Sequence, residues 1–291
     1  MPILKDVRMP AATTTELERL LDDDVPHGDL TTEALGIGGQ AGVMEFTARD
    51  PMVLALVDDA AAILGLCGCE VERMAMSGSR LAPGAPILTA RGGAAGLLRG
   101  WKVAQTLVEI WSGVATATRE IVDAARAVSP HIAVACTRKN TPGTKRFAVA
   151  AVKSGGAVMH RLGLSETILV FGEHRGFLDE PLAATVERLR RAAPEKKLVT
   201  EVSSIEAALA AAEAGFDVVQ LEKFAPADVA TLAQRLATGP HRPVIAAAGG
   251  VNASNAAAYA QAGAQVLVTS SPYMAKPRDV QVKIRREQQT N

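Results

Sequence analysis

From residue 130 onward, short apolar runs alternate with longer stretches in which hydrophobic residues recur every three or four positions. The apolar runs cover residues 132–137, 167–171, 198–202, 218–221, 244–247 and 265–269. The amphipathic stretches between the later runs cover residues 182–191, 205–214, 226–236 and 253–262. Strands that alternate with helices predict βαβ units and a parallel sheet. About six units favour an α/β barrel, complete or partial, over an open doubly wound sheet, which shows the same alternation.

The first 128 residues have a less regular pattern. Residues 13–21 predict a short helix that Thr15 caps, and residues 22–32 predict a loop because Pro and Gly lie among short polar residues. Apolar stretches at 42–48, 52–57 and 87–90, with a helix at 58–66, predict a small mixed α/β domain. Residues 97–128 then predict long helical sequence, with a break near Ser112-Gly113.

Composition narrows the possible classes of protein. Of 291 residues, 48% are hydrophobic and 21% are charged, which allows a substantial buried core. The formal net charge of +0 excludes a general attraction to nucleic acid or anionic membrane. No signal peptide or membrane span is evident, so we expect a cytoplasmic protein. Cys67, Cys69 and Cys136 form no C-x-x-C pair and predict buried reduced thiols, not disulfides or a zinc site.

Candidate chemistry lies where the predicted strands end, because parallel α/β folds bind ligands beyond the carboxyl ends of their strands. The first strand leads into Thr137-Arg138-Lys139, and residues 138–146 contain four cations. His160-Arg161 lies in the next glycine-containing loop. Lys offers a point charge to phosphate and Arg offers a fork to carboxylate, so these loops predict an anion site. A solvated basic loop is the alternative.

The later strand ends add carboxylates and small polar residues. Glu201 and Glu222 could hold sugar hydroxyls or a hydrated Mg²⁺, although buried ion pairs would show the same pattern. Gly249-Gly250 and Thr269-Ser270-Ser271 predict a phosphate cradle of backbone N–H groups and hydroxyls. Together these residues predict a multi-anionic phosphorylated substrate with a divalent metal and no organic cofactor. Acyl transfer and zinc chemistry are excluded, since no nucleophile elbow or histidine ligand spacing occurs.

At these residues the chain resembles the nicotinate-nucleotide pyrophosphorylase, or quinolinate phosphoribosyltransferase, family from about Leu20 to the last strand. The most specific shared motifs are residues 28–32 (GDLTT), 112–116 (SGVAT), 137–143 (TRKNTPG) and 160–164 (HRLGL). The resemblance implies an N-terminal α/β sandwich over residues 1–112, with residues 272–291 packing back on it, and a partial α/β barrel over residues 113–271. It also implies a homodimer, or a higher even oligomer, in which the partner's N-terminal domain completes each active site.

The family reaction joins quinolinate to phosphoribosyl pyrophosphate with Mg²⁺ and yields nicotinate mononucleotide, pyrophosphate and carbon dioxide. By position, the resemblance assigns substrate anions to Arg138, Lys139, His160 and Arg161, the ribose and metal to Glu201 and Glu222, and the phosphate to Gly249 and Gly250. Lys139, Glu201 and Glu222 are the catalytic candidates, and Lys139 would bind the leaving pyrophosphate. Thr137, Thr269, Ser270 and Ser271 complete the predicted binding site.

Several positions depart from the family pattern. The family has Arg where this chain has Lys102, Asn at Thr106, Lys at Phe171, Asp-Asn at Glu222-Lys223, and Ser at Ala248. A lysine cannot reproduce the bidentate fork of arginine, and Phe171 would line the pocket with a ring in place of a charge. We therefore expect an acceptor other than quinolinate. The departures resemble the ModD branch, a group of pyrophosphorylases named for an association with molybdenum transport.

Three other interpretations stay open from the sequence. The chain could be a true quinolinate phosphoribosyltransferase of NAD biosynthesis, with Lys102 sufficing for one carboxylate. It could instead be a non-enzymatic protein that binds oxyanions at Gly249-Gly250, in keeping with the molybdenum association. A lyase that forms a Schiff base at Lys139 or Lys223 is the third alternative, although no particular sequence feature indicates it.

Overall fold

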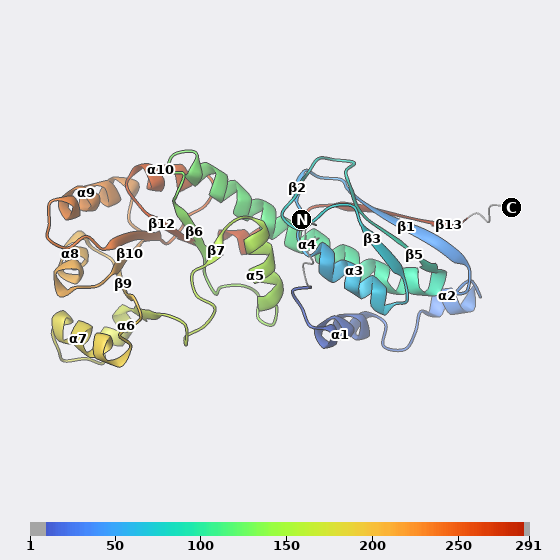
Figure 1. Cartoon of the computed structure of the whole chain (residues 1–291), viewed down its shortest axis with the longest axis horizontal. Coiled ribbons are helices and arrows are strands. Elements are labelled where there is room, and N and C mark those ends of the chain that lie inside the picture. Colours follow the sequence, from blue (N-terminus) through green and yellow to red (C-terminus); the bar gives the residue numbers. More distant parts are fainter. Residues whose placement is uncertain (1–9, 288–291) are drawn as a thin grey trace, which may run out of the picture. The chain divides into compact units, whose positions relative to one another are not determined.

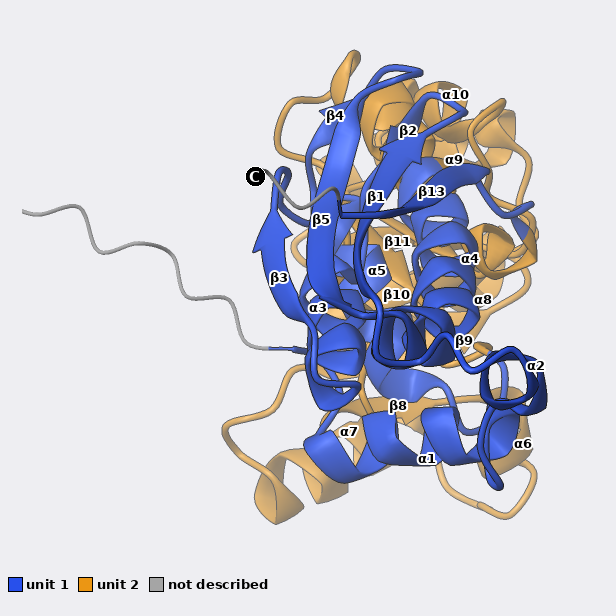
Figure 2. Ribbon diagram, turned by 90° about the vertical axis from the view of Figure 1, so that its right-hand side faces the viewer, with its two compact units in different colours: residues 1–116, 141–156, 275–291 blue, residues 117–140, 157–274 orange. Residues whose placement is uncertain are grey.

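A computed structural model describes residues 10–287, which divide into two compact units (Figures 1 and 2). Unit 1 comprises residues up to 116, residues 141–156 and residues from 275, and unit 2 comprises residues 117–140 and 157–274. The predicted division at residue 112 lies close to the first of these boundaries. The structure differs in placing segment 141–156 in unit 1. No helix within residues 10–287 is long and apolar enough to cross a membrane.

Unit 1 is built on a four-stranded antiparallel sheet. Its order is β13-β1-β5-β3, formed by Val280–Arg286, Ala41–Ala48, Pro86–Gly93 and Glu70–Arg73. The pairing of β13 with β1 brings residues 280–286 back to this unit. Of the segment 272–291 that was predicted to pack here, residues 272–274 belong to unit 2 and residues 288–291 lie outside the described residues. β2 (Met52–Val53) and β4 (Arg80–Leu81) form a separate pair, and helices α1 (Thr14–Asp24) and α3 (Val57–Leu66) pack together beside the sheet.

Two local predictions in unit 1 were wrong. Thr13, not Thr15, caps α1, because its hydroxyl accepts from the Glu16 N–H while the Glu16 carboxylate accepts from the Thr13 N–H. The end of the predicted loop forms the start of helix α2 (Leu30–Ala34), in which the N–H groups of Thr31 and Thr32 donate to the Asp29 carboxylate at 3.1 Å. Pattern analysis missed α2 because a five-residue helix shows little periodicity.

Helix α4 (Ala94–Arg126) runs through the predicted break at Ser112-Gly113. A β-carbon on Gly113 would lie 2.3 Å from the carbonyl oxygen of Lys276, so glycine permits close chain approach and does not end the helix. The buried Ser112 hydroxyl accepts from the Ala55 N–H at 3.0 Å. Thr116, one turn later, accepts from the Val53 N–H at 2.9 Å. The motif at 112–116 therefore holds the unit 1 part of α4 against the segment 53–55.

Unit 2 contains a seven-stranded parallel sheet in the order β7-β6-β12-β11-β10-β9-β8. Its strands are β6 (Ala133–Cys136), β7 (Val158–Met159), β8 (Ile168–Val170), β9 (Leu198–Val202), β10 (Val218–Glu222), β11 (Val244–Ala248) and β12 (Val266–Thr269). All six predicted strands are confirmed, while the two-residue β7 was not predicted. β7 and β8 form opposite edges of the sheet, which therefore makes a partial barrel.

Helices connect the parallel strands of unit 2. They are α6 (Gly172–Arg175), α7 (Leu182–Ala192), α8 (Ile205–Ala214), α9 (Pro226–Ala237) and α10 (Ala256–Gln261), followed by the 3₁₀ turn η1 (Ser271–Met274). Sequence analysis missed α6 and also α5 (Lys145–Ser154) of unit 1. The sheet's inner apolar cluster is made of small side chains: Ala246, Ala248 and Val268, with Val218 and Val266 packed against it. Small interior residues leave room for a ligand at the carboxyl ends of the strands.

The three cysteines are free thiols, as predicted from their spacing, but only Cys69 and Cys136 are buried, whereas Cys67 is half-buried. Burial raises the pKa of Cys69 to about 11 and that of Cys136 to about 12. Both groups are therefore protonated at neutral pH and pack as small apolar side chains.

Candidate functional site

A cavity of about 620 Å³ lies at the carboxyl ends of the parallel strands in unit 2. All but one of the predicted site residues line it: Thr137, Arg138, Lys139, His160, Arg161, Phe171, Glu201, Glu222, Gly249, Gly250, Thr269, Ser270 and Ser271. The exception is Lys102, which lies on α4 in unit 1, where its Nζ is 3.1 Å from Gln105 and 4.2 Å from the centroid of the Trp101 ring. The topology thus collects residues that are up to 134 positions apart.

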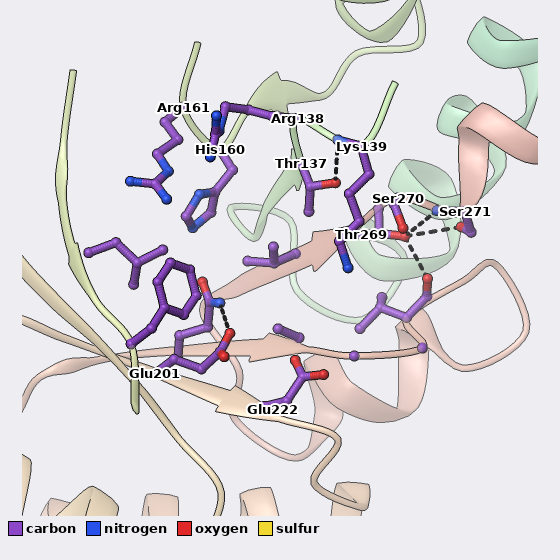
Figure 3. Close-up of a pocket in the computed structure, with 18 of the residues that line it drawn as sticks. Thr137, Arg138, Lys139, His160, Arg161, Glu201, Glu222, Thr269, Ser270 and Ser271 are labelled. Atoms are coloured by element: carbon purple, nitrogen blue, oxygen red, sulfur yellow. Dashed lines mark hydrogen bonds between the residues drawn. The ribbon is translucent and has the colours of Figure 1, made fainter. Parts of the chain in front are cut away.

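The basic side of the cavity comes from the loops after β6 and β7. The Thr137 N–H donates to the Thr269 carbonyl at 2.9 Å, and the Tyr273 hydroxyl donates to the Thr137 carbonyl at 2.8 Å. These bonds anchor the loop that carries Arg138 and Lys139. Figure 3 shows Arg138, with His160 and Arg161 from the loop after β7, on one side of the cavity, and Lys139 extending into it.

Arg161 is a buried cation at the edge of the cavity. Only 7% of this residue is exposed, and among residues 10–287 no carboxylate pairs with its guanidinium. Burial, followed by the charge of Arg138, lowers the pKa of Arg161, although an arginine still remains protonated at neutral pH. Burial also lowers the pKa of His160, and Arg161 and Arg138 lower it further, whereas the Gln220 side chain raises it. An unpaired buried guanidinium is costly, so this side of the cavity is built to receive an anion.

The acidic side comes from β9 and β10, opposite the cations (Figure 3). Glu201 lies in register with Gln220 of β10, and the Gln220 Nε2 donates to the Glu201 carboxylate at 2.7 Å. Burial raises the pKa of Glu201, and the neighbouring charge of Glu222 raises it further, whereas the Gln220 hydrogen bond lowers it. The two carboxylates repel each other and would be stabilised by a bound cation or by sugar hydroxyls.

Gln220 was not predicted as a site residue. It lies two positions before Glu222 in a strand, so its side chain projects to the same face of the sheet. The apolar run at 218–221 was interpreted only as a strand. A polar residue at the centre of such a buried run was the signal that could have identified it.

A glycine turn closes the cavity after β11. Gly249 and Gly250 have φ of +82° and +90°, which favour glycine. Two amide groups, from Asn252 and Asn255, donate to the Gly250 carbonyl at 3.0 Å each and hold the turn in place. The predicted helix from residue 253 begins only at Ala256. The glycine turn, and not the N-terminus of a helix directly after it, therefore forms the candidate phosphate site.

The hydroxyls at the end of β12 differ in availability. Thr269 is buried, and its hydroxyl donates to the Val251 carbonyl at 2.6 Å. The same oxygen accepts from the Ser271 N–H at 3.1 Å. Thr269 therefore supports the glycine turn. Because its proton is used in this way, the Ser271 hydroxyl donates to the Thr269 oxygen at 3.0 Å, while the Ser270 side chain also lines the cavity.

Phe171 separates the main cavity from a second one of about 480 Å³. Its ring stacks on His174, with centroids 5.8 Å apart and planes at 19°. The guanidinium carbon of Arg161 lies 5.8 Å from the Phe171 centroid. Leu169, Arg138 and Arg161 border both cavities together with Phe171. This wall offers a flat aromatic face beside two guanidinium groups, which suits a planar anionic ring.

The described residues contain no cluster of three or more His, Cys, Asp or Glu side chains that could hold a metal ion. The two carboxylates Glu201 and Glu222 remain as a candidate pair. Mg²⁺ in phosphate-binding sites commonly uses one or two protein carboxylates together with water and substrate oxygens, so the pair fits that ion.

Comparison with known proteins identifies the family. Residues 29–112 match the description "Quinolinate phosphoribosyl transferase, N-terminal domain", and residues 114–283 match "Quinolinate phosphoribosyl transferase, C-terminal domain". The chain is 49% identical over 245 residues to "Putative pyrophosphorylase ModD" of Rhodobacter capsulatus, covering 84% of this chain and 94% of that one. It is 33% identical over 274 residues to "Nicotinate-nucleotide pyrophosphorylase [carboxylating]" of Mycobacterium leprae (strain TN), covering 92% and 95%.

A solved structure agrees with this assignment. The crystal structure of NadC from Streptococcus pyogenes superposes with a TM-score of 0.86 at 25% identity, covering 94% of this chain and 96% of that one. Identity is thus higher to the ModD relative than to the carboxylating relative or the NadC structure. The chain therefore belongs to the quinolinate phosphoribosyltransferase family of pentosyltransferases, as an enzyme of the ModD-like pyrophosphorylase type.

Proposed function

We propose that this enzyme joins a small anionic nitrogen heterocycle other than quinolinate to phosphoribosyl pyrophosphate and releases pyrophosphate. The observation that carries the proposal is the composition of one cavity. Three cations, Arg138, Lys139 and Arg161, face two carboxylates, Glu201 and Glu222, across a space bounded by a glycine turn. A substrate that carries several phosphate charges and a ribose matches both sides of this cavity.

Different side chains of the cavity would bind different parts of the two substrates. Lys139 extends into the cavity and would bind the leaving pyrophosphate as a point charge. Arg138 and Arg161 would hold the anionic group of the acceptor beside the ring of Phe171. The carboxylates would bind the ribose hydroxyls, and the glycine turn with Ser270 and Ser271 would bind the 5′-phosphate. Displacement at an anomeric carbon passes through a cationic sugar, so positioning and electrostatics supply most of the catalysis.

Magnesium is part of the proposal. Glu201 and Glu222 would hold Mg²⁺ directly or through water, and the ion would neutralise charge on the pyrophosphate. Burial, and after it the charge of Glu222, raises the pKa of Glu201, and a cation bound between the two carboxylates would offset both effects. Lys139 remains the residue that contacts the leaving group from the opposite side.

The wall around Phe171 supports an acceptor other than quinolinate. Quinolinate carries two carboxylates, and the resemblance assigns one of its contacts to a lysine where this chain has Phe171. Each missing charged hydrogen bond costs on the order of 1.5–3 kcal/mol. The stacked pair of Phe171 and His174 offers ring contacts in place of that charge. A planar acceptor with one anionic group fits this wall.

We also propose that the protein acts as a homodimer or higher even oligomer. Lys102 occupies the position that the resemblance assigns to a partner's active site, and that resemblance supports this proposal. A link to molybdenum metabolism stays a prediction that rests on the resemblance to the ModD branch.

The test measures pyrophosphate release from phosphoribosyl pyrophosphate with Mg²⁺, against a panel of pyridine and azole carboxylates that includes quinolinate. Release with another acceptor, and little with quinolinate, is the expected result. Release with quinolinate at an ordinary enzymatic rate would identify a true quinolinate phosphoribosyltransferase instead. Oxyanion binding without release by any acceptor would support a binding protein and contradict the proposal.

Lys139→Ala tests the assignment of the leaving-group contact. We expect turnover to fall by at least 100-fold with an unchanged thermal melting curve, because a charge-assisted contact to the leaving group is lost. Lys145→Ala is the matched control, since Lys145 belongs to the same basic segment but does not line the cavity. Full activity of the Lys139 variant would refute this role.

A further inference from the structure

Gln220 holds a fixed orientation at the inner wall of the cavity. Its Nε2 donates to the Glu201 carboxylate at 2.7 Å. An ionised carboxylate only accepts hydrogen bonds, so the amide nitrogen must face Glu201 and the amide oxygen must face elsewhere. The strand register reinforces this arrangement, because Gln220 and Glu201 are directly paired on neighbouring strands.

The amide oxygen of Gln220 is an acceptor without a donor. Only 5% of the residue is exposed, and its buried Oε1 has no hydrogen-bond partner among the described residues. His160 borders the same cavity and lies near enough to Gln220 for that side chain to raise its pKa, but the two side chains form no hydrogen bond of normal length and angle. Buried polar groups in native proteins are nearly always paired, so an orphaned acceptor that lines a ligand cavity indicates a donor on the ligand.

The surroundings of Gln220 leave space for such a ligand. The residue paired with it on β11 is Ala246, and Val268 on β12 also belongs to the inner apolar cluster. These short side chains cannot supply a donor and do not fill the cavity in front of the amide. The cations Arg138 and Arg161 border the same cavity. A ligand in contact with Gln220 is therefore within a space that also binds an anionic group.

We propose that Gln220 determines acceptor specificity by accepting a hydrogen bond from an N–H, amino or hydroxyl group on the acceptor heterocycle. The inference rests on the proposed transferase function and adds the substrate class: a planar heterocycle with one anionic group and at least one donor. Quinolinate presents only acceptors at neutral pH, namely its ring nitrogen and two carboxylates, so it leaves the Gln220 oxygen unpaired. Donor-bearing acceptors gain roughly 10- to 100-fold over matched analogues without the donor.

The experiment compares ligand pairs that differ in one donor. Nicotinate, which has no donor at neutral pH, is set against 2-amino-, 5-amino- and 6-aminonicotinate. Affinity is measured by calorimetry on the full chain, and pyrophosphate release is measured with phosphoribosyl pyrophosphate and Mg²⁺. In the natural protein, we expect at least one amino compound to bind 10-fold or more tightly than its partner.

Two variants separate the proposed contact between Gln220 and the acceptor from the hydrogen bond between Gln220 and Glu201. Gln220→Met keeps the length of the side chain and removes both polar atoms, so the preference for the amino compound should fall to about one. Gln220→Glu loses the donor to Glu201 but keeps an acceptor oxygen, so the preference should survive even if overall affinity falls. Since the ratio compares two ligands on one protein, a general loss of folded protein does not alter it, and Gln220→Leu replaces Gln220→Met if the latter does not fold.

The outcomes also separate this inference from the proposed function. An equal preference in the natural protein and in Gln220→Met, or no preference in the natural protein, would overturn the role of Gln220, even if pyrophosphate release shows that the transferase proposal is right. Donor-dependent binding that disappears in Gln220→Met, without pyrophosphate release by any pair, would support Gln220 as a specificity residue and contradict the transferase proposal.

Discussion

Alanine can be substituted at either of two neighbouring positions in the glycine turn after β11. Both substitutions strain the backbone, but only one of them also creates a steric clash. Gly249 and Gly250 both have φ in the left-handed region, at +82° and +90°. A β-carbon added to Gly250 would meet nothing within 4 Å. One added to Gly249 would lie 2.6 Å from Cγ and 2.7 Å from the backbone nitrogen of Lys223, and 3.0 Å from the carboxyl carbon of Glu222.

The expected magnitudes follow from these distances. An alanine forced into the left-handed region costs about 1–2 kcal/mol, and both variants bear this cost. Carbon atoms normally pack 3.5–4.0 Å apart, so Gly249→Ala must also displace Lys223 by about 1 Å. Lys223 cannot move freely, because its own φ is +60° and its N–H donates to the Ala248 carbonyl at 2.8 Å. Overpacking of this kind adds about 1–3 kcal/mol.

We therefore expect Gly250→Ala to lower the free energy of unfolding by about 1–2 kcal/mol and Gly249→Ala by about 2–5 kcal/mol. The measurement is urea unfolding followed by far-ultraviolet circular dichroism, with hydrogen exchange of the β10 amides. Tryptophan fluorescence would not follow unit 2, since Trp101 and Trp111 both lie in unit 1. Gly249→Ala should also weaken binding of phosphoribosyl pyrophosphate with Mg²⁺, because the displaced segment carries Glu222. Equal losses in the two variants would refute the reasoning.

Three further predictions concern single side chains. Ser112→Ala leaves the buried Ala55 N–H without its acceptor and should lower the free energy of unfolding by about 1–3 kcal/mol in urea titrations, while an unchanged value would contradict the structural role of the motif. Because burial lowers the pKa of His160, its contribution to stability is fully present above the unfolded pKa of about 6.5 and is lost as the pH falls through it. The stability difference between the natural protein and His160→Gln should therefore shrink between pH 7.5 and 5, and a difference independent of pH would show that His160 is not held neutral. Tyr273→Phe removes the hydrogen bond to the Thr137 carbonyl and should cost about 0.5–1.5 kcal/mol and raise the KM for phosphoribosyl pyrophosphate; a change in kcat alone would argue against this anchoring role.

Much of unit 2 could be predicted because its local pattern and its tertiary structure agree. Each strand is a short apolar run, and each helix between the later strands presents one apolar face. The rule that ligands bind at the carboxyl ends of parallel strands then led from the pattern to Arg138, Glu201 and Gly249, which the structure places at one cavity. Predictions in unit 1 were weaker, because short elements such as α2 owe their stability to a cap at Asp29 more than to periodicity.

Pattern alone misjudged the residues whose role depends on distant parts of the chain. Gly113 resembled a helix break, yet it is required because the carbonyl of Lys276 lies where its side chain would be. Thr269 was expected to offer a hydroxyl to phosphate, yet that hydroxyl donates to Val251. Gln220 was not predicted as a site residue because it lies in an apolar run, although it lines the cavity and its amide donates to Glu201. Each of these roles follows from a contact between segments at least 18 residues apart.

The sequence by itself determined the strand and helix alternation, the kinds of charged group at the strand ends and the family to which they belong. These properties follow from local periodicity and residue chemistry, which folding does not change. Tertiary structure decided which charged groups remain unpaired. Among residues 10–287, Arg161 is buried without a carboxylate partner and the Gln220 oxygen is buried without a donor, because the chain fold brings no complementary group beside them. A substrate that binds here must supply an anionic group for Arg161 and a hydrogen-bond donor for Gln220.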